Sequence, residues 1–271
     1  SDPENPLKLV RSNSGWVLKS NRKEFEADQG IVNEILRTLK DMRASRIAAT
    51  DKSKWGNYEL TDSLATKVTV KKGKKTVSTI YVGKFSYQMP KNTNPYSYYG
   101  RQAKISTYVR TGKEDKVYAV DGFLTMLFNR NINDFRNKVI IRSNRNDWKS
   151  LTFSYPADSS FKMIKDKGKW TVDGIIIDSA VADEYLSSVT WFSSEDFVDE
   201  LKPLSSEPVF TLKIEGDNIV KPIIVKAFAS DTTHQYLISS SMNEGTYFSG
   251  KKSGLTDRIF ISKKKLLKVN Q

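Results

Sequence analysis

The chain carries an internal repeat, which limits the fold more than any other feature of the sequence. An apolar run, a turn with Gly15 and a strand at Trp16 return as an apolar run, a turn with Gly168 and a strand at Trp170. Apolar runs around a glycine-containing turn are typical of a β-hairpin. We therefore expect two copies of one module, each opening with a hairpin whose tryptophan anchors a core.

An amphipathic helix is expected after each hairpin. Its apolar positions are Ile31, Ile35, Leu36, Leu39 and Met42 in the first half, and Val181, Tyr185, Leu186, Val189 and Phe192 in the second. This shared spacing places five apolar side chains on one helical stripe. Asp28 and Asp178 each stand three residues before the first apolar position, where a carboxylate accepts hydrogen bonds from the free N–H groups of a helix.

Short apolar runs behind each helix predict an antiparallel meander. They are residues 68–70, 77–82, 108–110 and 117–120 in the first half, and residues 210–214, 219–227, 247–248 and 258–262 in the second. The sequence thus predicts an α+β fold made by tandem duplication. Each half is a small antiparallel sheet, the tryptophan-bearing hairpin plus the meander, packed on one amphipathic helix. We place the halves at residues 1–145 and 146–271.

Charge is divided unevenly between the halves. The formal net charge is +13. Residues 1–150 have 29 Lys and Arg against 15 Asp and Glu, which gives 29 − 15 = +14. Residues 151–271 have 15 against 16, which gives 15 − 16 = −1. Residues 171–200 sum to −8. A basic surface favours an acidic protein, anionic lipid headgroups or nucleic acid as a partner. Alternatively, the charge serves to keep the protein soluble.

The sequence offers no targeting signal and no cysteine. Its apolar runs are shorter than the roughly eighteen residues of a membrane span, and its start at Ser1 has neither the basic nor the apolar region of a signal peptide. We expect the natural protein to continue upstream into a signal peptide or membrane anchor. Without cysteine there are no disulfides or thiolate sites, and the redox compartment is undetermined.

Several short motifs follow one another in a characteristic order. They are Trp16 with Leu18, Ala27 with Asp28, residues 58–60, residues 80–83, residues 108–110 with 117–120, and residues 135–138. In this order they resemble the bacterial family called "domain of unknown function 4340", over nearly the whole chain and more weakly in the second half. In that family a glycine usually follows the tyrosine of the third motif, where this chain has Glu59.

The resemblance implies an extracytoplasmic protein of the periplasm or cell envelope, held by an N-terminal membrane anchor. Members of the family are often encoded beside gliding-motility-type ABC transporters, which implies an accessory role in such a system. No catalytic residue comes with the resemblance.

A search for chemistry in the sequence finds no active site. His234 is the single histidine, so a zinc site lacks ligands, and a Ser-His-Asp triad would need this one ring beside an activated serine. Residues 245–252 approach a phosphate-binding loop, but Lys252 stands where a hydroxyl should bind Mg²⁺ and the interior of the segment reads as a strand. We expect no enzyme activity, no metal and no cofactor, and a surface position for His234.

Two segments of the first half are candidates for binding. The loop of residues 85–106 offers aromatic and hydrogen-bonding side chains of the kind favoured in binding surfaces, namely Tyr96, Tyr98, Tyr99 and Arg101. The tip of the hairpin after residue 70 is the densest basic point, with Lys71, Lys72, Lys74 and Lys75. Lysine at such a tip also protects strand edges.

Three functional hypotheses follow. The first is a non-enzymatic envelope domain that binds a component of an ABC-type transporter. The alternative is a glycan-binding module that uses the tyrosine-rich loop, because aromatic faces stack on sugar rings. A weaker alternative is binding of nucleic acid or another anionic surface by the basic half, which salt would weaken.

Overall fold

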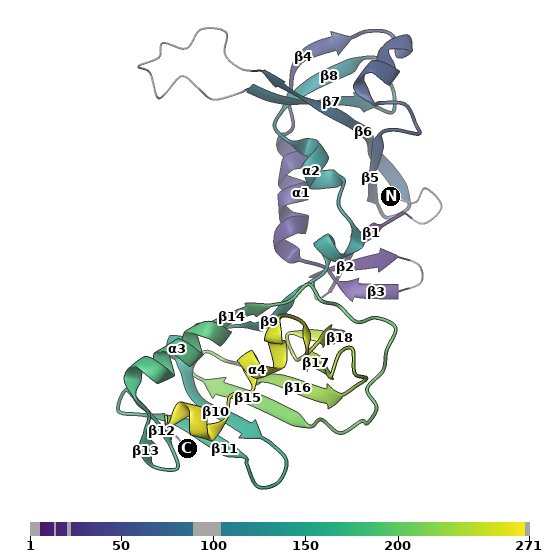
Figure 1. Cartoon of the computed structure of the whole chain (residues 1–271). Coiled ribbons are helices and arrows are strands. Elements are labelled where there is room, and N and C mark those ends of the chain that lie inside the picture. Colours follow the sequence, from purple (N-terminus) through teal and green to yellow (C-terminus); the bar gives the residue numbers. More distant parts are fainter. Residues whose placement is uncertain (1–5, 14, 21–22, 89–103, 269–271) are drawn as a thin grey trace, which may run out of the picture. The chain divides into compact units, whose positions relative to one another are not determined.

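The computed structural model describes residues 6–13, 15–20, 23–88 and 104–268. The chain forms two compact units, Ser1–Phe135 and Arg136–Gln271, whereas the sequence suggested a boundary at 145/146. Both units mix helices with sheets, and every strand pairing among the described residues is antiparallel (Figure 1). The predicted α+β class is therefore confirmed.

Unit 1 opens with a three-stranded sheet and a helix. These are β1 (Lys8–Ser12), β2 (Gly15–Ser20), β3 (Lys23–Glu26) and α1 (Gln29–Asp41). The expected stripe of α1 is only partly right, because Leu36 is exposed and Val32 is buried beside Ile35 and Leu18. Val32 and Ile35 are packed together with Ile31 and Leu39, so the buried face is rotated about the helix axis away from Leu36.

A five-stranded sheet completes unit 1. In the order of the sheet, its strands are β4 (Ala44–Ala49), β8 (Val117–Asp121), β7 (Lys104–Thr111), β6 (Lys75–Gln88) and β5 (Thr66–Lys72). The 3₁₀ helix η1 (Lys52–Tyr58) brings Trp55 into a core with Leu60 and Tyr108. The short helix α2 (Leu124–Phe128) packs Leu124 against Val82, and η3 (Ile132–Phe135) ends the unit. Two small cores therefore hold this sheet.

Two family motifs of unit 1 meet at Gly83. This glycine lies in β6 where the register shifts between Val82 and Phe85. A Cβ atom there would lie 2.1 Å from the carbonyl oxygen of Tyr58 and 3.0 Å from Cγ of Leu60. The backbone of residues 58–60 thus approaches β6 so closely that only glycine fits.

Glu59, at the position where the family usually has glycine, adopts a left-handed backbone. Its φ of 57° and ψ of 38° close the end of η1. A side chain in this region costs about 1 kcal/mol, whereas glycine adopts it freely. The left-handed backbone at position 59 therefore explains why the family usually has glycine there.

We expect Glu59→Gly to raise the free energy of unfolding of unit 1 by about 0.5 kcal/mol, because relief of the strain exceeds the extra chain entropy of glycine in the unfolded state. Urea denaturation measures this change. Glu59→Ala is the matched control, since it removes the same side chain but keeps Cβ. An equal gain in both variants would assign the effect to the lost carboxylate instead.

Unit 2 is built on an eight-stranded sheet. Along the chain its strands are β10 (Trp148–Ser154), β11 (Phe161–Asp166), β12 (Lys169–Val172), β13 (Ile175–Ile176), β15 (Phe210–Gly216), β16 (Ile223–Ala229), β17 (Tyr236–Ser240) and β18 (Asn243–Ser249). β10 pairs with both β11 and β15, so it joins the tryptophan hairpin to the meander in one sheet. In unit 1 the corresponding strands form two separate sheets.

The remaining elements of unit 2 are short, apart from α3. They are β9 (Val139–Arg142), η4 (Arg145–Asp147), α3 (Ser179–Thr190), β14 (Trp191–Ser193), η5 (Lys252–Gly254), α4 (Leu255–Ile259) and α5 (Lys263–Leu266). β14 pairs with β9 in a two-stranded sheet.

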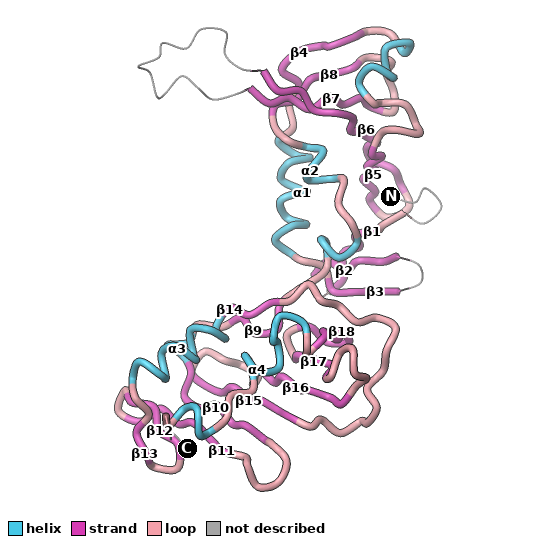
Figure 2. The backbone as a smooth tube through the Cα atoms, in the orientation of Figure 1, coloured by secondary structure: helices cyan, strands magenta, loops and turns pink. Residues whose placement is uncertain are grey.

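One predicted strand of unit 2 is wrong. Residues 258–262 were expected to pair with 247–248, but Arg258 and Ile259 end α4, and β18 pairs with β17 (Figure 2). Leu255 and Ile259 are buried and stand four residues apart, which is the spacing of a helix face. A short apolar run does not distinguish the two structures by itself. β16 begins directly after Pro222, which has no N–H to donate to a strand pairing.

Part of the element order recurs in the two units, with η1, η3, β9, η4, β10, η5 and α5 outside the shared series. Unit 1 runs β1, β2, β3, α1, β4, β5 to β8 and α2, and unit 2 runs β11, β12, β13, α3, β14, β15 to β18 and α4. Asp28 caps α1 through the N–H groups at positions 30 and 31, and Asp178 caps α3 through those at 180 and 181. The carbonyl oxygens of Trp16 and Trp170 each accept from the residue before the cap, at 3.1 and 2.8 Å.

Six of the eight acidic residues in the segment 171–200 form ion pairs within unit 2. Its ion pairs are Asp173–Lys263, Asp178–Lys268, Asp183–Arg145, Glu195–Lys138, Asp196–Lys252 and Asp199–Arg136. The cations come from segments before and after it in the chain. Most of these pairs are exposed and contribute little to stability, whereas the pair of Asp199 with the buried Arg136 is the strongest candidate to stabilise unit 2.

Candidate binding site on unit 2

The helix α3 presents a polar face beside an exposed tryptophan. Val181, Tyr185 and Val189 are buried in the core of unit 2. The hydroxyl of Tyr185 donates to the carbonyl of Ile259 at 2.7 Å, and burial raises the pKa of this hydroxyl. Position 187, on the outward side of the helix, carries a serine. Directly after the helix, Trp191 begins β14 with 69% of its surface exposed.

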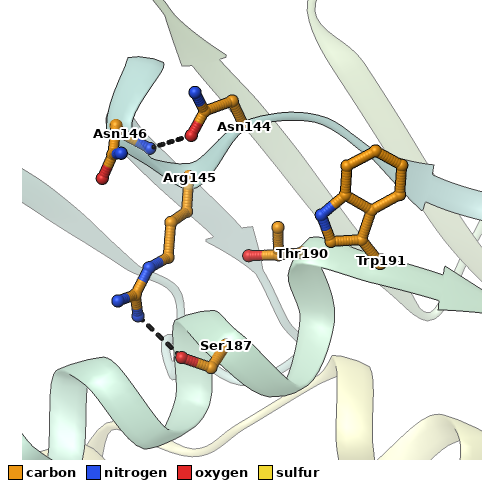
Figure 3. Close-up of a pocket in the computed structure, with 6 residues that line it drawn as sticks. All are labelled: Asn144, Arg145, Asn146, Ser187, Thr190 and Trp191. Carbon is orange, nitrogen blue, oxygen red and sulfur yellow. Dashed lines mark hydrogen bonds between the residues drawn. The ribbon is translucent and has the colours of Figure 1, made fainter.

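Arg145 fastens η4 to the polar face of α3. Its Nη1 donates to Oγ of Ser187 at 2.6 Å and lies 3.4 Å from Oδ1 of Asp183. Asn144 accepts the N–H of Asn146 at 3.0 Å and thereby caps η4 (Figure 3). One nitrogen of the guanidinium, Nη1, thus contacts two residues of α3 that lie one turn apart.

An open hollow lies between Arg145 and Trp191. Its volume is about 500 Å³, and Figure 3 shows Arg145 reaching to Ser187, with Thr190 and Trp191 at the other side. Thr190 donates to the carbonyl of Leu186 at 2.6 Å, so its hydroxyl is already used. The guanidinium of Arg142, opposite Trp191 in the β14–β9 pairing, lies 5.7 Å from the centre of the indole ring.

A second hollow adjoins the first on the other side of Arg145. It has a volume of about 570 Å³ and lies between the first turns of α3 and the strands β11 to β13. Trp170 and the exposed Ile176 line it. Together the two hollows form one surface, which we name the α3 groove, with Trp191 and Ile176 at its ends and Arg145 in its middle.

The α3 groove was not among the predicted site residues. The sequence signal that points to it is the position of Trp191, one residue away from Phe192, which the apolar stripe of the helix includes. Arg145 gave no signal in the sequence. Its contacts with Asp183 and Ser187 join residues that are 38 and 42 positions apart in the chain. Non-local contacts of this kind follow only from the fold.

The predicted lysines lie at the β5–β6 hairpin tip of unit 1, and all four are exposed. The structure aligns Lys72 with Lys75 across the turn and Lys71 with Thr76. The predicted binding residues Tyr96, Tyr98, Tyr99 and Arg101 lie outside the described residues.

The single histidine, His234, contacts the side chain of Ser249. Nδ1 of His234 lies 3.0 Å from Oγ of Ser249, and the ring is half-buried instead of lying on the surface as expected. Ser249 itself is buried, so a substrate would not reach its hydroxyl. The pair therefore connects β18 to the start of β17 and does not form a nucleophilic site.

Metal ligands and membrane-spanning helices were also sought. Across the part of the chain that the structure describes, His, Asp and Glu side chains nowhere form a group of three or more able to hold a metal ion. Among the helices of that same part, none has the length and apolarity needed to cross a membrane.

Comparison with known proteins identifies the family. The model of the family described as Domain of unknown function (DUF4340) matches residues 16–208, from β2 through β14. The match covers more than half of the chain and ends before β15. Neither the curated proteins nor the solved structures gave a match. The chain therefore belongs to the family Domain of unknown function (DUF4340).

Proposed function

We propose that this chain is a non-enzymatic, extracytoplasmic module of the cell envelope that binds a protein component of an ABC-type transport system through the α3 groove. The observation that carries the proposal is Trp191, a large apolar ring exposed at the rim of a hollow whose polar side chains are already held in place. Exposed tryptophan and arginine are the residue types that dominate binding energy at protein interfaces.

The shape of the α3 groove favours a protein over a small molecule. Both hollows are open to solvent, whereas sites for small molecules enclose most of their ligand. Apolar side chains at the two ends, Trp191 and Ile176, flank the charged centre at Arg145. Because Ser187 and Asp183 already orient this arginine, it loses little freedom when a partner binds.

The identity of the partner, the extracytoplasmic location and the N-terminal membrane anchor come from what the family resemblance implies. The α3 groove supports binding, and the family supports the transport system as the source of the partner. The two parts of the proposal are tested together below.

We expect Trp191→Ala to weaken partner binding by about 2 kcal/mol, or about thirtyfold in Kd, because truncating an interface tryptophan removes its large apolar contact area. The measurement is co-purification of the native, anchored protein from its own membranes, with transporter components quantified by mass spectrometry. Val220→Ala is the matched control, since Val220 is also apolar and 97% exposed but lies outside the groove.

Two outcomes would contradict the proposal. Failure to recover any transporter component with the unchanged protein removes the proposed partner. Equal recovery with Trp191→Ala and with Val220→Ala removes the proposed site.

A glycan is the second candidate ligand, favoured by an exposed indole beside the amides of Asn144 and Asn146 in the first hollow. The tyrosine-rich loop remains the site that the sequence predicts for such a ligand. A glycan array separates the two sites, because binding lost with Trp191→Ala indicates the hollow and binding lost with Tyr98→Ala plus Tyr99→Ala indicates the loop.

We also propose that the two units descend from a tandem duplication. The shared order of elements, the aspartate caps at 28 and 178 and the tryptophan carbonyl contacts support this proposal. Experimental structures test it: the caps must coincide when α1 and its hairpin are superposed on α3 and its hairpin. On this account β10 joins the two sheets of the second copy.

A further inference from the structure

The segment that forms β5, β6 and β7 contains no acidic residue. Between Asp62 and Glu114 the sequence has eleven cations, namely Lys67, Lys71, Lys72, Lys74, Lys75, Lys84, Lys91, Arg101, Lys104, Arg110 and Lys113. Unit 2 distributes its charge differently, because its acidic segment is paired with its own cations. The excess charge of the chain is thus concentrated in one meander of unit 1.

The β5–β6 hairpin projects beyond the rest of its sheet. Pairing between β6 and β7 runs from Ile80 to Gln88, and the carbonyl of Thr79 accepts from the N–H of Gly112, so residues 75–78 of β6 pair only with β5. Gly73, with a φ of 60°, occupies the first position of the two-residue turn. Positive φ is what a tight hairpin turn requires there. The tip is therefore the end of a narrow two-stranded ribbon.

The side chains of this tip face solvent. Lys71, Lys72, Lys74 and Lys75 are all exposed, and none has an ion-pair or hydrogen-bond partner within the described part of the chain. Val77 lies among them with 57% of its surface exposed. By contrast, Arg110 of the same meander is buried between Trp55 and Tyr81 and paired with Asp62, so it supports the fold. The four tip lysines are the densest group of exposed cations in this segment.

We propose that the β5–β6 hairpin tip of unit 1 docks on an anionic phospholipid surface. This contact goes beyond the proposed function and is independent of the α3 groove. Each lysine near such a surface contributes attraction that corresponds to about a fivefold change in partitioning. Four lysines on the end of a narrow ribbon can reach a flat surface together, and Val77 offers an apolar side chain to the headgroup region.

The composition of the tip favours lipid over nucleic acid. Residues 71–77 contain lysine, glycine, threonine and valine, with neither an aromatic side chain nor an arginine. Single-stranded nucleic acids stack their bases on aromatic side chains, and duplex readout uses arginine, asparagine or glutamine. A lysine cluster supplies charge without either of these contacts.

Flotation of the full chain with vesicles tests the proposal. The probes are vesicles of phosphatidylcholine alone and of phosphatidylcholine with about 30% phosphatidylglycerol, at low and physiological salt. We expect binding only to the anionic vesicles and weakening by salt. Replacing Lys71, Lys72, Lys74 and Lys75 by glutamine is expected to lower the partition coefficient at least ~50-fold.

A second quadruple variant controls for total charge. It carries glutamine at four exposed lysines of unit 2 that lie outside the tip, Lys202, Lys221, Lys226 and Lys264. We expect it to change partitioning less than ~3-fold, because these lysines belong to separate segments of unit 2 and not to one hairpin tip. Melting curves of both variants verify that they are folded.

Three results would overturn the proposal. One is the absence of binding to anionic vesicles, and another is an equal loss in both quadruple variants, which reduces the effect to net charge. The third is binding to a random-sequence DNA that is tighter than vesicle binding and is lost with the tip lysines, which would make nucleic acid the partner.

Discussion

Gly83→Ala is expected to lower the free energy of unfolding of unit 1 by about 3 kcal/mol or more, because a methyl group is forced into a well-packed interior. The added Cβ would lie 2.1 Å from the carbonyl oxygen of Tyr58. That oxygen belongs to the backbone, and the neighbouring Leu60 is fully buried and hydrogen-bonded to Trp55. Relief therefore requires movement of η1 or of β6, and either movement disturbs the core around Trp55.

Hydrogen–deuterium exchange measures this loss in unit 1 separately from unit 2. We expect faster exchange of the β6 and β7 amides in Gly83→Ala and unchanged exchange in β10 to β18. Gly56→Ala is the control, because no atom lies within 4 Å of its added Cβ. Protection of β6 that is equal in the two variants would show that the close approach at Gly83 is not a constraint.

Asp199→Ala is expected to destabilise unit 2 by about 3 kcal/mol, the cost of leaving a buried charge without its partner. Arg136 is 2% exposed at its side chain, and its Nη1 and Nη2 donate to the two carboxylate oxygens of Asp199 at 2.7 and 2.8 Å. The guanidinium also lies 3.7 Å from the ring centre of Phe197. Asp199 itself is 32% exposed. We therefore expect the loss in free energy of unfolding to lie at the lower end of the range for a broken buried ion pair.

Urea denaturation of three variants tests this pair. Asp217→Ala, which breaks an exposed pair with Lys149, should cost less than ~0.5 kcal/mol. The double variant Arg136→Met with Asp199→Ala should be more stable than Asp199→Ala alone, because it also removes the buried charge that has lost its carboxylate. A loss below about 1 kcal/mol in Asp199→Ala would contradict the account of Arg136 as a buried charge that depends on this carboxylate.

Local signals in the sequence predicted the parts of the fold that local physics determines. Asp28 and Asp178 cap their helices because a carboxylate before a helix finds free N–H groups wherever the rest of the chain lies. The glycine-containing turns before Trp16 and Trp170 likewise form hairpins. The order of the motifs also sufficed to identify the family.

Features that depend on contacts between distant segments were not predictable. Residues 255–259 form a helix because Leu255 and Ile259 meet the core of unit 2, although the overlapping run 258–262 is predicted as a strand. The α3 groove depends on η4 packing against α3 through Arg145. The left-handed backbone of Glu59 lies within residues 58–60, and the close approach of these residues to Gly83 is a contact between distant segments. Each of these requires the tertiary structure.

Site-specific photo-crosslinking tests the central claim, that the α3 groove binds a transporter component, most directly. A photoreactive phenylalanine derivative replaces Trp191 in one variant and Val220 in another, and both variants are irradiated in native membranes. The account predicts a crosslink from position 191 to a component of an ABC-type transporter and none from position 220. No crosslink from position 191, or the same products from both positions, would contradict it.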